Sequence, residues 1–177
     1  MDQKEPEGSL RISVITVSDT RTLETDKSGQ ILVEFVHQSS HQLVHRVIVK
    51  DDTPSIRDTV AHQCSAGNVD VVLLTGGTGI TERDVTPEAI SPLVTKEIPG
   101  FGELFRMLSY ADIGAATIQS RAFAALCGRV LVFALPGSTG AVQLAVDKII
   151  CPQLDRATKP CNFAQLLPRI RHDPAPR

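Results

Sequence analysis

Four short runs of Val, Ile and Leu constrain the fold of this chain more than any other feature. They cover residues 12–17, 43–49, 69–74 and 130–135, and the last two are almost wholly apolar. Continuous apolar runs of this length are typical of parallel strands that are covered on both faces. The pattern therefore predicts four buried strands in one sheet.

Helical patterns separate and follow these strands. In some of these segments apolar side chains recur at helical spacing. In others a capping residue or a Thr-Pro pair marks the start of the helix. Asp26 or Ser28 could cap the first helix. The expected helices include residues 31–36, start at Thr53 and at Thr86, and cover residues 117–126 and 142–150.

Strands that alternate with helices predict the fold class α/β. We expect a single domain with a doubly wound, mainly parallel sheet and helices on both faces. Its expected bounds are 10–155, after a polar extension at 1–9 and before a tail at 156–177 that crosses the surface or docks on a neighbouring subunit. Residues 97–116 look less regular, which suggests an inserted subregion or an interaction surface.

Composition excludes several classes of protein. With 42% apolar and 21% charged residues, the 177-residue chain is not disordered throughout, and its net charge of −2 argues against general nucleic-acid or anionic-membrane binding. No apolar run is long enough to span a membrane, and the N-terminus does not resemble a signal peptide. The four cysteines are widely spaced and are expected to be reduced thiols. We therefore expect a cytoplasmic protein.

Small and acidic residues follow all four predicted strands. Ligands of open α/β sheets bind beyond the carboxyl ends of the strands, so these residues are the candidates for a site. The segments are Ser18-Asp19, Asp51-Asp52, Thr75-Gly76-Gly77-Thr78-Gly79 and Pro136-Gly137-Ser138-Thr139-Gly140.

The two glycine-containing loops suit a phosphate site, because backbone N–H groups without an obstructing Cβ can surround an anion. Either loop could instead be a tight turn between a strand and a helix. The P-loop pattern is absent, and Glu82 stands where the dinucleotide fingerprint needs its last glycine.

Asp51 and Asp84 are the sharpest candidates for chemistry. Carboxylates beside a phosphate need a cation between them, and Mg²⁺ binds one or two carboxylates together with phosphate oxygens. Asp52 competes with Asp51 for this role. Asp84 could instead be a charge near a helix N-terminus, and Asp51 a turn residue.

Four motifs resemble the MoaB/MogA family of molybdenum cofactor biosynthesis proteins, which is related to the gephyrin G domain. They are TGGTG at 75–79, DVTPEA at 84–89, PGFGE at 99–103 and LPGS at 135–138, in the family's order and spacing. The segments 105–109, 119–121 and 160–163 are similar to the MoaB branch. The resemblance covers roughly residues 10–165.

The resemblance implies a molybdopterin-binding fold and the transfer of an adenylyl group from MgATP to molybdopterin, with release of pyrophosphate. Asp51 and Asp84 would be catalytic and would hold Mg²⁺ through the bound nucleotide, with no permanently bound cofactor. The implied phosphate- and nucleotide-binding residues are Thr75, Gly76, Gly77, Thr78, Gly79, Pro136, Gly137 and Ser138, and the implied pterin-binding residues are Ser18, Asp19, Glu103, Ser109 and Ser120.

The family also implies self-association as a homotrimer or hexamer, and other proteins of molybdenum cofactor biosynthesis are candidate partners. The apolar segment 98–113 agrees with a subunit interface. Neither nucleic acid nor a membrane is an expected partner. One alternative is a non-catalytic molybdopterin carrier or assembly protein, and another is an unrelated nucleotide-binding module.

Overall fold

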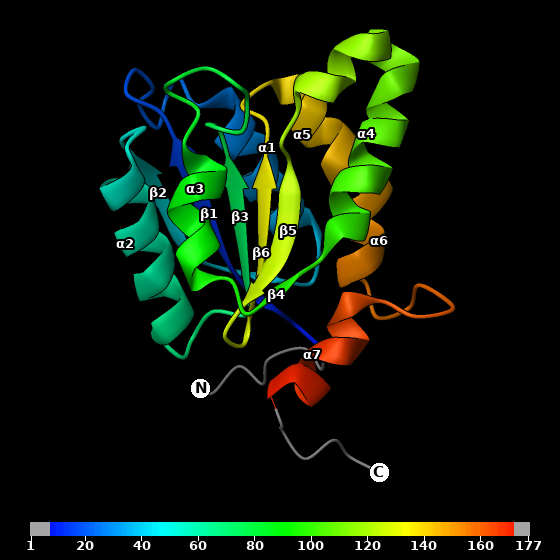
Figure 1. Ribbon diagram of the computed structural model, residues 1–177. Coiled ribbons are helices and arrows are strands. Elements are labelled where there is room, and N and C mark those ends of the chain that lie inside the picture. Colours follow the sequence, from blue (N-terminus) through cyan, green and yellow to red (C-terminus); the bar gives the residue numbers. More distant parts are fainter. Residues whose placement is uncertain (1–7, 172–177) are drawn as a thin grey trace.

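The computed structural model describes residues 8–171, which form one six-stranded sheet with the order β2-β1-β3-β6-β5-β4 (Figure 1). β2, β1, β3 and β6 are parallel, whereas β5 pairs antiparallel with both β6 and β4. The strands are β1 (Arg11–Val17), β2 (Gln42–Val49), β3 (Val71–Thr75), β4 (Lys96–Glu97), β5 (Phe123–Cys127) and β6 (Val130–Leu135). All four predicted strands are present, but the expected burial of the second is wrong, because β2 lies at the edge of the sheet and none of its residues is fully buried.

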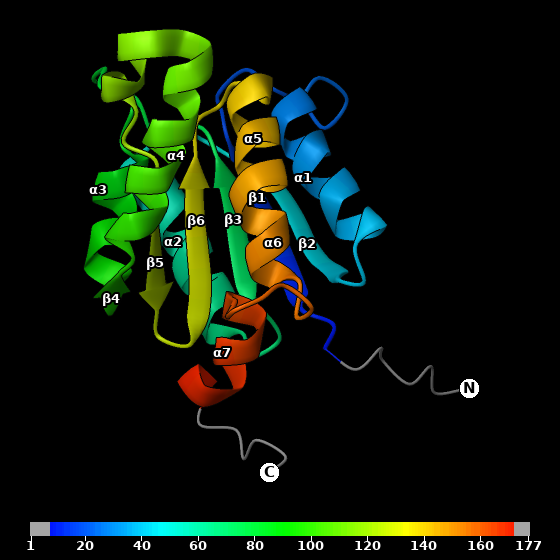
Figure 2. The same cartoon turned by 90° about the vertical axis from the view of Figure 1, so that its right-hand side faces the viewer.

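Helices cover both faces of the sheet. α2 and α3 pack on one face, and α1, α4, α5 and α6 pack on the other (Figures 1 and 2). This confirms the predicted α/β class with a mainly parallel, doubly wound sheet. The helices are α1 (Lys27–Gln38), α2 (Thr53–Ser65), α3 (Thr86–Ile90), η1 (Ser91–Leu93), α4 (Pro99–Ile113), η2 (Gly114–Gln119), α5 (Thr139–Ala145), the π-helical η3 (Val146–Ile150), α6 (Cys151–Leu154) and α7 (Phe163–Arg171).

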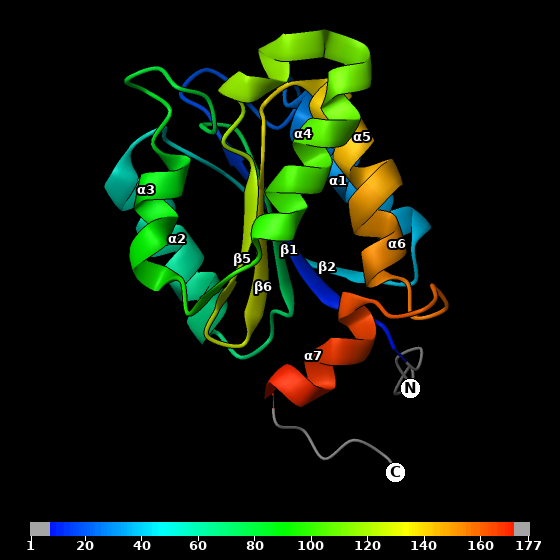
Figure 3. The same ribbon diagram turned by 45° about the vertical axis from the view of Figure 1, so that its right-hand side comes forward.

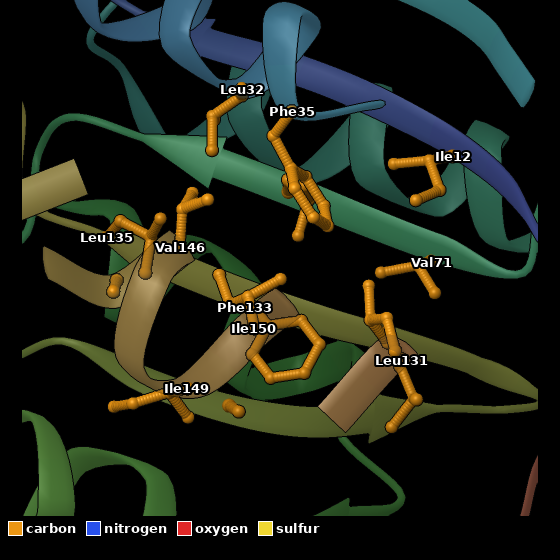
Figure 4. Close-up of a cluster of buried hydrophobic side chains, with 14 of the residues drawn as sticks. Ile12, Leu32, Phe35, Val71, Leu131, Phe133, Leu135, Val146, Ile149 and Ile150 are labelled. Carbon is orange, nitrogen blue, oxygen red and sulfur yellow. The ribbon is translucent and has the colours of Figure 1, made fainter. Parts of the chain in front are cut away.

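Alternating side chains of the central strands build two cores, one on each face of the sheet. Ile12 and Val14 of β1 lie in the core under α1 and α5, whereas Ile15 and Val17 lie in the core under α2. Phe133 of β6 is fully buried in the first core, between the sheet and its helices (Figure 4). Burial on both faces explains why these strands are continuous apolar runs.

Two regions differ from the sequence prediction. The helix expected at 117–126 is wrong, because the chain there forms the short η2 and then β5, which pairs along its whole length with β6. Residues 99–113, which looked irregular, form the regular helix α4, because Gly100 and Gly102 fall in its first turn and Phe101 and Phe105 are buried one turn apart. Strand pairing and burial outweighed local propensity in both places.

The ends of the predicted domain can be described only in part. In the segment expected to form the tail, α7 lies below the sheet with Ala164 and Leu167 buried in the first core (Figure 3). Residues 1–7 of the predicted extension and 172–177 of the predicted tail lie outside the described residues. All four cysteines are free thiols. Within residues 8–171, no helix has the length and apolar character of a membrane span.

Candidate functional site

The residues that follow β1, β2, β3 and β6 meet at one end of the sheet, at the top in Figure 1. β1 lies between β2 and β3, so the direction of winding reverses beside it. Ligands of doubly wound sheets bind beyond the carboxyl ends of the strands at such a reversal. Asp19 follows β1, and its Oδ1 accepts the N–H of Asp51, which follows β2, at 3.1 Å.

The glycine loop that follows β3, residues 76–79, is closely packed. Gly76 and Gly77 have φ angles of +112° and +65°, which favour glycine. A Cβ on Gly76 would lie 2.4 Å from the carbonyl oxygen of Val17, and one on Gly77 would lie 3.1 Å from Asp51 Oδ1. The loop therefore brings bare backbone against the end of β1 and against Asp51, which follows β2.

Two of the loop's N–H groups already have partners. The N–H of Gly76 donates to the carbonyl oxygen of Leu135 at 3.0 Å, and that of Gly79 donates to the Asp84 carboxylate. Within residues 8–171, the N–H groups of Gly77 and Thr78 donate no hydrogen bond. Gly77 and Thr78 are therefore the donors that this loop can offer to an anion.

The second predicted phosphate loop, residues 136–138, lies against the first. Thr75 Oγ1 donates to the carbonyl oxygen of Pro136 at 2.9 Å, and a Cβ on Gly137 would lie 3.5 Å from the Cα of Gly76. Ser138 is the N-cap of α5, where its side chain accepts the N–H of Ala141. The two loops thus form one continuous backbone surface.

Asp51 faces this surface with an unpartnered oxygen. Its Oδ1 is buried, and no hydrogen-bond partner for it exists in the described part of the chain. Burial raises the pKa of Asp51 above its ordinary value, and the charges of Asp19 and Asp84 raise it further, against the opposing charge of Arg83. A cation beside this oxygen would relieve both effects.

Asp84 has the opposite environment. Its Oδ2 accepts the N–H of Thr81 at 2.9 Å and the Thr81 hydroxyl at 2.6 Å. Burial by itself would raise the pKa of Asp84, but these hydrogen bonds, that from Gly79 and the charge of Arg121 together hold it below its ordinary value. Asp84 is therefore a fixed, ionised carboxylate.

The structure separates Asp51 from Asp52. Asp52 is the N-cap of α2, where its Oδ1 accepts the N–H of Ser55 at 2.7 Å. That hydrogen bond lowers the pKa of Asp52. Asp52 thus caps a helix, whereas Asp51 faces the glycine loop.

This arrangement fits the Mg²⁺ that the family implies. Mg²⁺ binds oxygen ligands and commonly takes one or two carboxylates together with phosphate oxygens. The unpartnered, buried Oδ1 of Asp51 is such a ligand, and Asp84 adds a second charge close enough to influence it. The described residues contain no group of three or more His, Cys, Asp or Glu side chains placed to hold a metal. Oxygens of water or of a bound phosphate would complete the coordination of Mg²⁺ here.

The opposite pKa shifts predict opposite effects of two substitutions on stability. Because the pKa of Asp51 is raised, its contribution to stability is greatest below the ordinary Asp pKa of about 3.9 and is lost as pH rises through the raised pKa. Asp51→Asn should therefore raise Tm at pH 7, and the gain should disappear near pH 3. A lower Tm for this variant at pH 7 would contradict the assignment.

Asp84→Asn should have the reverse effect and serves as the matched comparison. The lowered pKa of Asp84 means that its charge stabilises the fold above the ordinary pKa, and that this stability is lost as pH falls through the lowered value. We expect a lower Tm at pH 7, with the difference shrinking in acid. Calorimetry of both variants between pH 3 and pH 7 measures the two trends.

Sequence reasoning missed two arginines of this site. Arg83 forms an ion pair with Asp19. Arg121 donates to the carbonyl oxygens of Gly79 and Asp84 and forms an ion pair with Glu88. An arginine beside a candidate aspartate, as in Arg83-Asp84, is the signal that could have drawn attention to the first, and the resemblance of segment 119–121 to the MoaB branch is the signal for the second.

A cavity of about 890 Å³ lies beside the site, between α3, β5 and α4. Of the residues assigned to the pterin, Glu103 and Ser120 line this cavity, whereas Ser18 lies at the end of β1 next to Asp19. Ser109 lies in neither place, because its hydroxyl is buried and donates to the carbonyl oxygen of Phe105 within α4. Arg121 and Glu88 border both this cavity and a smaller one beside Asp84.

Comparison with known proteins agrees with these observations. Residues 13–156 match the family described as "Probable molybdopterin binding domain". The chain is 53% identical to molybdenum cofactor biosynthesis protein B of Bacillus subtilis over 146 residues, which cover 82% of this chain and 86% of that protein. It is 48% identical to the protein of the same name from Escherichia coli K12 over 153 residues, covering 86% and 90%.

Solved structures show the same fold. A crystal structure of molybdenum cofactor biosynthesis protein B has a TM-score of 0.84 and 45% identity, and the match covers 97% of this chain and all of that one. The tungsten cofactor synthesizing protein MoaB of Pyrococcus furiosus has a TM-score of 0.72 and 39% identity, with 81% and 91% covered. The chain belongs to the family of probable molybdopterin-binding domains that includes molybdenum cofactor biosynthesis protein B.

Proposed function

We propose that this protein binds molybdopterin and transfers the adenylyl group of MgATP to its terminal phosphate. Its relatives support a role in molybdenum cofactor biosynthesis. The observation that carries the finer proposal is the buried, unpartnered Oδ1 of Asp51, which faces a glycine loop with two free N–H groups. That combination suits a phosphate bound together with a cation.

In this reaction the protein would position the reacting phosphates and balance their negative charge. The free N–H groups of Gly77 and Thr78 would hold phosphate oxygens, and Gly137 and Ser138 of the adjoining loop would hold a second phosphate. The Asp51 and Asp84 carboxylates would hold Mg²⁺, which supplies positive charge where the leaving group becomes more negative.

The reaction needs no nucleophile from the protein. An oxygen of the molybdopterin phosphate forms a bond to the α-phosphorus of ATP, and the bond between that phosphorus and the bridging oxygen breaks. The electron pair leaves with pyrophosphate. A phosphate monoester is already largely a dianion at neutral pH, since its second pKa is about 6, so no side chain has to remove a proton.

The direct test is to incubate the purified protein with molybdopterin and MgATP and to measure pyrophosphate. We expect ATP-dependent pyrophosphate release and a pterin whose mass has increased by one adenylyl group. Tight molybdopterin binding without pyrophosphate would instead support the alternative, a non-catalytic carrier or assembly protein of the same pathway. ATP binding without pterin binding would support an unrelated nucleotide-binding module.

We also propose that the protein is a homotrimer or a hexamer. α4 and η2 expose large apolar side chains, which is unusual for a surface that remains in water. Four of them recur at every third position of α4. Their exposed fractions are 38% for Leu104, 65% for Met107, 62% for Tyr110, 56% for Ile113 and 81% for Ile118.

Light scattering should therefore give a mass of three or six chains at micromolar concentration. Replacing Met107 and Ile113 together by Glu should shift the mass to that of one chain, because two charges would enter an apolar interface. Both side chains are exposed in the single chain, so the far-UV circular dichroism should be unchanged. A wild-type mass of one chain would contradict this proposal.

A further inference from the structure

Arg83 differs from the other arginine of the site in how it is held. Arg121 is fixed by the carbonyl oxygens of Gly79 and Asp84 and by Glu88. Arg83 has one ion pair within residues 8–171, with Asp19, and its side chain remains 66% exposed. Arg83 is therefore the cation of this site that can exchange its partner.

The partner of Arg83 connects it to the acidic residues. Asp19 pairs with Arg83 through Oδ2 and accepts the N–H of Asp51 through Oδ1. The charges of Asp19, Arg83 and Asp84 all act on Asp51. The guanidinium of Arg83 is thus paired with Asp19 and close enough to Asp51 to act on its charge, and Asp51 faces the loop that offers free N–H groups.

We propose that Arg83 is a phosphate-binding arm, which Asp19 holds beside the glycine loop until a polyphosphate binds and takes over the guanidinium. This inference rests on the proposed function, because it assumes that the phosphates of MgATP bind at Gly77 and Thr78. It assigns to Arg83 a role in binding substrate and to Asp19 a role in positioning Arg83.

Physical chemistry favours the exchange of partners. An exposed ion pair is weak, because both groups remain hydrated and salt screens their attraction. A polyphosphate carries several negative charges, and a guanidinium can donate two parallel hydrogen bonds to phosphate oxygens. A cation held by Asp51 and Asp84 would also reduce the attraction between Arg83 and Asp51.

The test is titration calorimetry with MgATP and, separately, with inorganic tripolyphosphate. Arg83→Gln should raise the Kd of both ligands by about 10- to 100-fold, the usual effect of losing a hydrogen bond to a charged group. Arg83→Lys keeps the charge but loses the planar guanidinium that donates two parallel hydrogen bonds. Its Kd values should lie between those of the wild type and those of Arg83→Gln. The matched control is Arg57→Gln, which removes an exposed arginine paired at 4.0 Å with Asp58 on α2 and should leave both Kd values unchanged.

The variant Asp19→Asn distinguishes a phosphate-binding role of Arg83 from a purely structural role of its ion pair with Asp19. It releases Arg83 but keeps an oxygen for the N–H of Asp51. If Arg83 binds phosphate, MgATP affinity should hold or increase in this variant. If the ion pair merely shapes the loops, Asp19→Asn should weaken binding as much as Arg83→Gln does, and the proposal is overturned.

The outcomes also separate this inference from the proposed function. If the wild type and Arg83→Gln bind MgATP equally well, the role of Arg83 as a phosphate-binding arm is overturned, but the proposed function is not. Tripolyphosphate binding that depends on Arg83 supports the arm even if the protein releases no pyrophosphate with molybdopterin. Wild-type protein that binds neither ligand overturns both proposals.

Discussion

Replacing Asp51 or Asp84 by Asn is expected to lower the turnover of adenylyl transfer by about 10²- to 10³-fold. The substitution keeps the size of the side chain but removes a preorganised charge at the reacting phosphates. Losing one such electrostatic contact typically costs about 2.7–4 kcal/mol in transition-state stabilisation. Pyrophosphate release under saturating MgATP and molybdopterin measures the effect.

Binding of molybdopterin should change far less in the same variants. The anionic groups of the pterin are repelled by a bare carboxylate, so removing one charge should leave the affinity unchanged or slightly improved. Asp52→Asn is the matched control, because Asp52 caps α2 and its side chain does not face the glycine loop. Full activity in both Asp51→Asn and Asp84→Asn would remove these aspartates from the mechanism.

Gly77→Val should abolish the binding of MgATP. The φ of +65° at Gly77 is strongly disfavoured for a β-branched residue. A Cβ there would also lie 2.4 Å from Thr86 Oγ1 and 3.1 Å from Asp51 Oδ1, so the loop and the carboxylate have to move apart. Calorimetry should detect no ATP binding, while circular dichroism shows a folded protein of lower stability.

Gly128→Val separates the clash from the backbone strain. Gly128 joins β5 to β6 with a φ of +62°, almost that of Gly77, but nothing lies within 4 Å of a Cβ at this position. Both variants should lose stability to a similar extent through the strained φ. Gly128→Val should nevertheless bind MgATP normally, and normal binding by Gly77→Val would show that the loop is only a turn.

Several features of the site were predictable because their signals are local. A parallel strand that is covered on both faces needs apolar residues on both, so β1, β3 and β6 appear in the sequence as largely apolar runs. β2 lies at the edge of the sheet and is only partly buried, and its sequence accordingly keeps His45 and Arg46. The ligand end of such a sheet follows from strand direction. The glycine loop and Asp51 were therefore identifiable before the structure was known.

Other features depended on neighbours distant in sequence. Residues 123–127 became a strand because β6 pairs with them, although the local pattern suggested a helix. Ser109, assigned to the pterin by resemblance, is buried within α4, where its hydroxyl donates to the carbonyl oxygen of Phe105, and it does not line the cavity that Glu103 lines. Neither outcome can be read from the residues immediately before and after these positions.

The sequence by itself determined the fold class, the end of the sheet where a ligand is expected, and the glycine and acidic residues placed there. Only the tertiary structure distinguished the environments of Asp51 and Asp52, because Asp52 caps α2 while Asp51 faces Gly77 of the glycine loop. It also revealed the pairing of Arg83 with Asp19, which are 64 residues apart. Periodicity reports which faces of an element are buried, whereas the environment of a charge depends on groups that only folding brings together.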